Sequence, residues 1–178
     1  YTATGEGTSP PDTGTSDSLV AIDLATGRQK WVFQALANDI WHMGCPIGPP
    51  GPGAKINPNC FFAGEGSVLL DHDFGGGPVI WRGKGRELIL GGQKSGEVWA
   101  VNATDGKVVW HHRFGKGSPL GGVHWGIATD GVRVFAPIAD PNIPAPLNAA
   151  GLYAIDIASG KVAWSWKAMP DCANGRQA

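Results

Sequence analysis

The sequence has little charge and no long apolar run. Its 178 residues include 14 Lys or Arg and 15 Asp or Glu, for a formal net charge of -1. A near-neutral chain has no electrostatic attraction for a phosphate backbone, so nucleic acid is not a predicted partner. No apolar stretch reaches the roughly 18 residues of a membrane-spanning helix. With 42% hydrophobic residues, the composition also excludes a disordered chain.

Cysteine is scarce, with three residues at Cys45, Cys60 and Cys172. No Cys-x-x-Cys-His segment exists to attach a c-type haem, and the scattered spacing does not support a zinc site. Cys45 and Cys60 flank a Pro/Gly-rich segment, and a disulfide between them would add about 3 kcal/mol of stability. Such a bond predicts an exported protein, periplasmic or extracellular. Two unrelated thiols are the alternative, and Cys172 has no obvious partner in the sequence.

Glycine, proline and tryptophan are abundant, with 28, 14 and 8 residues. Helix interiors disfavour Gly and Pro, so this composition predicts short strands joined by turns. The chain starts at Tyr1 and its last residues lack any capping signal, from which we expect a piece of a larger protein.

One hairpin pattern occurs three times, at residues 18–31, 96–110 and 151–164. In each, an apolar strand ends in Asp or Asn, a short turn ends in Gly, and a second strand ends in Trp. The Asp or Asn bonds the turn backbone and the Gly supplies a positive φ. The residues are Asp23, Gly27 and Trp31; Asn102, Gly106 and Trp110; and Asp156, Gly160 and Trp164.

The spacing of these hairpins predicts an all-β propeller domain over residues 1–178. A Pro/Gly-rich insert at 42–72 interrupts the first interval, and removing it leaves a period of roughly 50 residues, as in a four-stranded blade. The length then provides about three to four blades. A solenoid is the rival interpretation, but β-solenoid coils are shorter and helical repeats would not tolerate this Gly content. Each repeated Trp is expected to pack between neighbouring blades.

The Ala-Ile-Asp-x-x-Thr/Ser-Gly-Lys-x-x-Trp hairpin resembles the tryptophan-docking repeat of quinoprotein alcohol dehydrogenases. These are eight-bladed propellers that hold pyrroloquinoline quinone (PQQ) and Ca²⁺ or a similar ion on their axis. Further segments, in order along the chain, are most similar to the polyvinyl-alcohol-dehydrogenase-like branch. They are residues 1–6, 38–41, 73–75, 92–96 and 121–126.

The resemblance implies a catalytic base and a metal site. Asp73 matches the family's base, a carboxylate that takes the alcohol proton and often also binds the metal. Its alternative role is a turn Asp that caps local backbone. Glu6 stands where the family offers an Asn oxygen to the metal, so the resemblance implies a ligand with one more negative charge. That departure indicates either a more highly charged ion, such as a lanthanide, or a decayed metal site.

The resemblance also implies residues that contact the cofactor. Lys94 stands where the family usually has an Arg that reaches the quinone oxygens; its alternative is a solvated turn Lys. Trp125 and His124 belong to a segment that reaches the cofactor from a later blade, where an aromatic edge can line the flat pocket. His111 and His112 are adjacent on a strand, so they face opposite sides and cannot share one ligand set.

The insert at 42–72 connects Trp41 to Asp73, which places both of its ends near the predicted pocket. We therefore expect it to form part of the rim that selects substrate. Deleting residues 46–59 should then change substrate preference more than cofactor affinity.

The leading functional prediction is PQQ-dependent oxidation of an alcohol, including secondary or polymeric alcohols. It needs the remaining propeller blades and an electron acceptor such as a cytochrome c, so the isolated chain is expected to be inactive. The first alternative is a non-enzymatic propeller that binds proteins as a scaffold or sensor domain. A structural or adhesive fragment with open sheet edges is the second.

Overall fold

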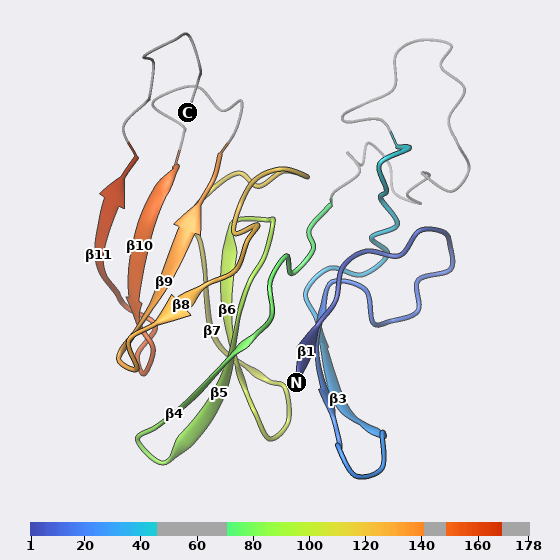
Figure 1. Cartoon of the computed structure of the whole chain (residues 1–178), viewed down its shortest axis with the longest axis horizontal. Coiled ribbons are helices and arrows are strands. Elements are labelled where there is room, and N and C mark those ends of the chain that lie inside the picture. The colour runs from blue at the N-terminus through green and yellow to red at the C-terminus, as the bar shows by residue number, and fades with distance from the viewer. Residues whose placement is uncertain (46–70, 141–148, 169–178) are drawn as a thin grey trace, which may run out of the picture.

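The computed structural model describes residues 1–45, 71–140 and 149–168, and within these ranges the chain is entirely β with no helix. The strands form three antiparallel sheets that lie side by side in chain order (Figure 1). The first contains β1 (Thr2–Ala3), β2 (Ser18–Ile22) and β3 (Gln29–Gln34). The second contains β4 (Val79–Gly83), β5 (Arg86–Gly92), β6 (Glu97–Asn102) and β7 (Val108–Arg113). The third contains β8 (Ala128–Thr129), β9 (Arg133–Ile138), β10 (Gly151–Asp156) and β11 (Val162–Lys167).

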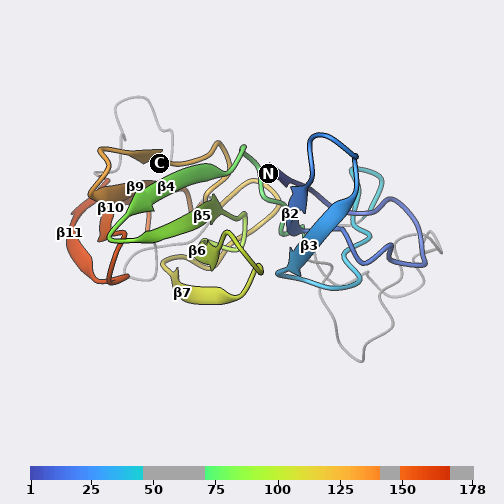
Figure 2. The same cartoon turned by 90° about the horizontal axis from the view of Figure 1, so that it is seen from below.

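Within each sheet, strands that follow one another in the chain also pair with one another. This is the meander of a propeller blade, and the sheets succeed one another as blades do (Figure 2). The prediction of a partial β-propeller is therefore confirmed. Among the described residues, no helix is long and apolar enough to cross a membrane.

The repeated sequence pattern forms the same hairpin in every sheet, namely β2–β3, β6–β7 and β10–β11. In the first hairpin, Oδ1 of Asp23 accepts hydrogen bonds from the backbone N–H of Thr26 at 2.9 Å and from its hydroxyl at 2.8 Å. The turn glycines Gly27, Gly106 and Gly160 have φ angles of 69°, 72° and 70°. Glycine adopts this left-handed region without strain, and the matching angles make the three turns conformationally equivalent.

The two largest apolar clusters of the core lie one on each face of the middle sheet, and a small third cluster contains Trp41 and Cys45. Leu88 and Leu90 of β5 belong to the cluster shared with the third sheet, while Ile89 belongs to the cluster shared with the first. This alternation is the two-residue period of a strand that is covered on both faces. The middle sheet is thus packed like an interior blade.

Trp31 joins the first sheet to the second. Its indole N–H donates to the carbonyl of Ala103 at 2.9 Å, and its ring lies so close to Gly106 that a Cβ there would approach it to 2.7 Å. The ring is 9% exposed. The predicted packing of Trp31 between blades is confirmed.

Trp110 joins the second sheet to the third in the same way. Its indole N–H donates to the carbonyl of Ile157 at 2.9 Å, and a Cβ on Gly160 would lie 2.6 Å from the ring. The third repeated tryptophan differs, because Trp164 is 43% exposed and donates no hydrogen bond among the described residues.

Several predictions concern residues that the structure does not describe. The insert at 42–72 is described only at its two ends, so its predicted role at the pocket rim stays a prediction. The same holds for the Cys45–Cys60 disulfide, since Cys60 lies outside the described ranges, and for any partner of Cys172.

Candidate functional site

Several loops that are distant in the sequence meet beside the first two sheets. The backbone N–H of Phe74 donates to the carbonyl of Thr4 at 3.4 Å, and that of Lys94 donates to Asp73 at 2.9 Å. The backbone N–H of Val123 in turn donates to Gln93 at 3.0 Å. These bonds connect, in series, the loop after β1, the segment before β4, the β5–β6 turn and the segment before β8. All predicted site residues belong to these segments.

Glycines make this approach possible. A Cβ on Gly5 would lie 2.5 Å from Oδ1 of Asp73, and one on Gly75 would lie 1.9 Å from the carbonyl oxygen of His124. Gly122, at φ 64°, would place a Cβ 2.0 Å from the carbonyl oxygen of Lys94. A larger residue at these positions would push the loops apart. The glycine-rich motifs of the sequence therefore serve close backbone packing around the site.

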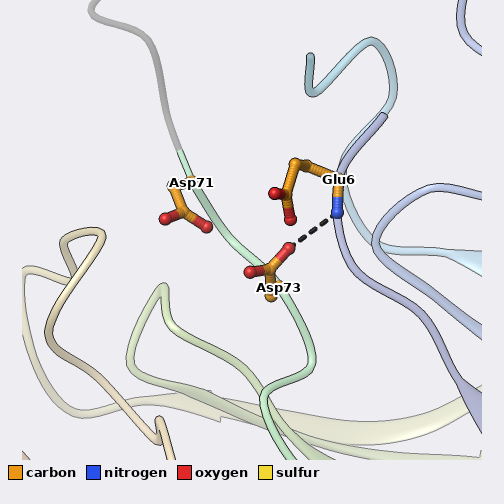
Figure 3. Close-up of side chains that lie close together, drawn as sticks. All are labelled: Glu6, Asp71 and Asp73. Carbon is orange, nitrogen blue, oxygen red and sulfur yellow. Dashed lines mark hydrogen bonds between the residues drawn. The ribbon is translucent and has the colours of Figure 1, made fainter. Parts of the chain in front are cut away.

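The carboxylates of Glu6, Asp71 and Asp73 gather at this meeting point (Figure 3). One oxygen from each lies within 4.8 Å of the others. The backbone N–H of Glu6 donates to Oδ1 of Asp73 at 2.7 Å, shown as the dashed line in Figure 3. The predicted pair Glu6 and Asp73 is thus brought together, with Asp71 as a third member that the sequence analysis missed.

Lys94 neutralises part of this negative charge. Its Nζ lies 2.7 Å from Oδ1 of Asp71 and 2.5 Å from Oδ2 of Asp73. The Lys94 side chain is largely buried, which excludes the alternative of a solvated turn lysine. Burial by itself would lower the pKa of the ammonium, but hydrogen bonds to Asp71 and Asp73 raise it. Lys94 therefore stays charged at neutral pH.

The three carboxyl groups have different acidities. Burial opposes the ionisation of Asp73, but hydrogen bonds from Glu6, Lys94 and Asp71 outweigh it and lower its pKa to about 2. Burial, and then the nearby Asp73, raises the pKa of Glu6 to about 7. Burial also raises the pKa of Asp71 to about 7, against the opposing hydrogen bond from Lys94. At neutral pH Asp73 is therefore fully ionised, whereas Glu6 and Asp71 are each about half ionised.

The donor set fits a hard cation. Oδ2 of Asp71 is buried and has no hydrogen-bond partner among the described residues, which is costly for a carboxylate oxygen. Ions such as Ca²⁺ take carboxylate oxygens at sites of this kind. A cation would also offset the excess of carboxylates over the ammonium of Lys94, which adds to the effect of burial in raising the pKa values of Glu6 and Asp71.

A second carboxylate arrangement holds the Asp71–Asp73 segment in place. Asp39 is fully buried, and its Oδ2 accepts the backbone N–H of His72 at 2.9 Å while its Oδ1 accepts that of Trp41 at 3.0 Å. Asp17 lies beside it, also fully buried, at φ 45°. Burial, and then the charge of Asp39, raises the pKa of Asp17 to about 10, so Asp17 is protonated at neutral pH.

Two sequence signals point to the residues that were missed. Asp71 and Asp73 are two positions apart in an extended segment, which places their side chains on one side. Asp39 belongs to the Asn38-Asp-Ile-Trp41 segment that carried part of the family resemblance, although no role was assigned to it. For Asp17, we find no comparable signal in the sequence.

His124 and Trp125 lie on the segment that packs against Gly75. Their rings stack at a centroid distance of 4.2 Å. Burial, and then the charge of Lys94, lowers the pKa of His124, so the imidazole is neutral at pH 7. Trp125 is 86% exposed and presents a bare aromatic surface. The structure therefore brings this segment to the site, with His124 turned inward and Trp125 outward.

His111 and His112 lie apart from the site and from each other. His111 stacks on Trp99 at 4.5 Å, and its Nδ1 lies 3.2 Å from Oε1 of Glu97. His112 contacts the carbonyl of Gly160 through Nε2. Their different partners agree with the expectation that they cannot form one ligand set.

Two protein-family models match this chain. Residues 3–50 match the β-propeller domain of glucose/ethanol/alcohol dehydrogenases, a PQQ model, and residues 94–174 match a second PQQ model named for the outer membrane protein assembly factor BamB. Together with the sheets and their repeated hairpins, these matches define a partial propeller built of PQQ-type repeats, similar to PQQ-dependent alcohol dehydrogenases.

Curated relatives make the similarity more specific. The chain is 35% identical over 159 residues to a polyvinylalcohol dehydrogenase from Sphingopyxis sp. (strain 113P3), and 33% identical over 155 residues to one from Pseudomonas sp. These alignments cover 88% and 86% of this chain but only 23% and 22% of the relatives. The chain thus spans about a quarter of their length. The crystal structure of BamB from Moraxella catarrhalis aligns with 94% of this chain and 32% of its own, at 13% identity and a TM-score of 0.48.

Proposed function

We propose that this propeller serves the PQQ-dependent oxidation of an alcohol, secondary or polymeric, with Asp73 as the base. The observation that carries the proposal is the position of the Asp73 carboxylate. It is ionised and partly buried, and it is held between the backbone N–H of Glu6 and the ammonium of Lys94. The similarity to polyvinylalcohol dehydrogenases supports an alcohol as the substrate class.

In this proposal Asp73 accepts the hydroxyl proton of the alcohol, which leaves the oxygen free to form the carbonyl product. PQQ, when bound, supplies the carbonyl carbon that receives the hydride from the same carbinol carbon. Lys94 orients Asp73, and its ammonium would supply positive charge for the quinone oxygens. Trp125 offers an aromatic surface for a flat cofactor, and the neutral His124 lies behind it.

A hard cation, Ca²⁺ or a lanthanide, completes the proposed site. Glu6, Asp71 and Asp73 would hold it, since each contributes an oxygen to the cluster. Its chemistry would be that of a Lewis acid that polarises a quinone oxygen. The replacement of the family's Asn by Glu6 then supplies a charged ligand, and the arrangement of the three carboxylates favours an intact site over a decayed one.

The proposal is tested by titrating the full-length protein with PQQ and Ca²⁺ or a lanthanide, while following absorbance and dye-coupled oxidation of alcohols. We expect saturable binding and turnover, with electrons passing in the cell to an acceptor such as a cytochrome c in a periplasmic or extracellular setting. If the protein showed neither binding of PQQ nor turnover of alcohols under these conditions, the enzyme function would be refuted.

A scaffold function is the second candidate, and the match of residues 94–174 to the BamB model favours it. The two candidates differ in what they require of the carboxylates. A protein-binding propeller has no need for buried acidic groups around Lys94, so their replacement would leave partner binding unchanged. The enzyme proposal requires these groups for cofactor binding and turnover.

A further inference from the structure

The carboxylates of the proposed cation site come from two separate segments of the chain. Glu6 lies in the loop after β1, whereas Asp71 and Asp73 lie in the segment before β4 (Figure 3). The backbone N–H of Glu6 donates to Asp73, and that of Phe74 donates to the carbonyl of Thr4. Neither of these bonds involves Asp71, so further contacts are needed to fix its distance from Glu6.

Asp39 is hydrogen-bonded to both segments at once. Its backbone carbonyl accepts the N–H of Gly7, the residue after Glu6, at 2.9 Å. Its side-chain Oδ2 accepts the backbone N–H of His72 at 2.9 Å, and His72 is the residue between the two aspartates of the cluster. A single residue therefore connects the immediate neighbours of all three carboxylates.

Asp39 is itself firmly held. Its Oδ1 accepts the backbone N–H of Trp41 at 3.0 Å, and the side chain is fully buried. Asp17, which lies beside it and is also fully buried, donates its backbone N–H to the carbonyl of Gly5 at 3.0 Å. The loop is thus anchored on both sides of Glu6, at Gly5 and at Gly7.

Stability alone does not explain a carboxylate at position 39. A buried carboxylate loses hydration that hydrogen bonds replace only in part, and Asp39 adds negative charge to a region that is already acidic. The bond to Trp41 is a local turn, but the bond to His72 spans 33 positions of the sequence and serves no local turn. Two acceptor oxygens on one side chain are suited to accepting two backbone N–H groups from separate segments.

We propose that Asp39 is a positioning residue of the cation site, which holds Glu6 at the distance from Asp71 and Asp73 at which their oxygens can share one ion. The inference rests on the proposed function, because it assumes the cation site. Both side-chain oxygens of Asp39 are engaged with backbone N–H groups, so Asp39 acts through the three ligands and not by touching the ion.

The test is a titration of Tb³⁺ alone, without PQQ, into the full-length protein. Luminescence measures the affinity, and the decay rates in H₂O and D₂O give the number of water molecules on the bound ion. The parent protein should bind saturably. Asp39→Ala should weaken binding by at least about tenfold, as is typical for a residue that orients metal ligands. It should also add at least about one water to the ion, because water replaces a displaced carboxylate.

Two further variants separate positioning from charge and from stability. Asp39→Asn removes the same charge as Asp39→Ala but keeps one acceptor oxygen, so its affinity and water number should lie between those of the parent and Asp39→Ala. Trp31→Ala removes a buried contact between blades, away from these segments, and should leave both quantities unchanged although it lowers stability. If Asp39→Ala does not fold, the water number of Asp39→Asn decides the question.

The possible outcomes are distinct. A parent protein that binds Tb³⁺ while Asp39→Ala matches it in affinity and water number would overturn the inference and leave the proposed function standing. Equal weakening by Asp39→Asn and Asp39→Ala, with no added water, would overturn it in favour of a charge effect. Equal weakening by Trp31→Ala would overturn it in favour of general destabilisation. A parent protein that binds no Tb³⁺ would refute the cation site of the proposed function and the inference with it.

Discussion

The blade junctions and the carboxylate cluster use glycine for opposite purposes. At the junctions, a missing side chain at Gly106 or Gly160 makes room for an indole ring, and the contact is apolar with one neutral hydrogen bond. At the cluster, Gly5 lets the chain approach the Asp73 carboxylate and Gly75 lets it approach the backbone of His124, and the carboxylates of Glu6, Asp71 and Asp73 lie close together. The first use stabilises the propeller. The second accumulates negative charge that Lys94 and a bound cation must offset.

The largest effect is expected from Asp73→Asn in the full-length protein. The amide keeps the hydrogen bond from Glu6 but cannot accept a proton, so turnover should fall by about 10²–10⁴-fold. PQQ absorbance should still show bound cofactor. The control is Asp130→Asn, which alters an exposed turn carboxylate of the third sheet. A nearly unchanged rate for Asp73→Asn would mean that Asp73 is a structural turn residue.

Lys94→Met should have the largest effect on stability. The substitution removes the ammonium group that pairs with the buried carboxylates of Asp71 and Asp73. We expect this loss to lower the free energy of unfolding by about 3–5 kcal/mol. Denaturant unfolding would measure the loss. The matched variant Lys107→Met breaks an ion pair with Asp105 whose Lys side chain is 83% exposed, and should cost less than about 1 kcal/mol. Equal losses of unfolding free energy in the two variants would show that the buried ion pairs of Lys94 contribute no more to stability than an exposed ion pair.

Trp31→Ala probes the junction instead of the cluster. Removing a buried indole and its hydrogen bond to Ala103 should lower the free energy of unfolding by about 3 kcal/mol. Trp164→Ala removes a ring that is 43% exposed and packs on Phe135, so it should lower the free energy of unfolding by only about 1 kcal/mol. Thermal or denaturant unfolding at low protein concentration compares the two. Similar losses would contradict the difference in packing between them.

Much of this comparison was predictable from the sequence, but not all of it. The hairpins follow from local rules, because the Asp or Asn, the turn Gly and the Trp lie within one short segment. The meeting of Glu6, Asp73 and Lys94 followed only from a family resemblance. The partnership of Asp17 with Asp39 was not predicted, because it depends on how the loop after β3 folds against the start of β2, which no local pattern specifies.

A further difference concerns the pH dependence of stability that arises from Asp17. Its pKa is raised from 3.8 in the unfolded chain to about 10 in the fold. The folded state therefore holds this proton more tightly, and the contribution of Asp17 to stability is complete below about pH 4 and declines as pH rises toward 10. Asp17→Asn removes the titrating carboxyl group and should flatten this decline. Unfolding curves at several pH values test it, and parallel profiles for both proteins would contradict it.

The central claim is that Glu6, Asp71 and Asp73 form a cation site beside Lys94. Calorimetric titration of Ca²⁺ or a lanthanide into the full-length protein, in the presence of PQQ, tests it most directly. We predict saturable binding of one ion per chain, weakened at least about tenfold by Asp71→Asn, since a charged ligand is lost, and unchanged by Asp130→Asn. Absence of binding, or equal affinity in the parent and Asp71→Asn proteins, would contradict the account.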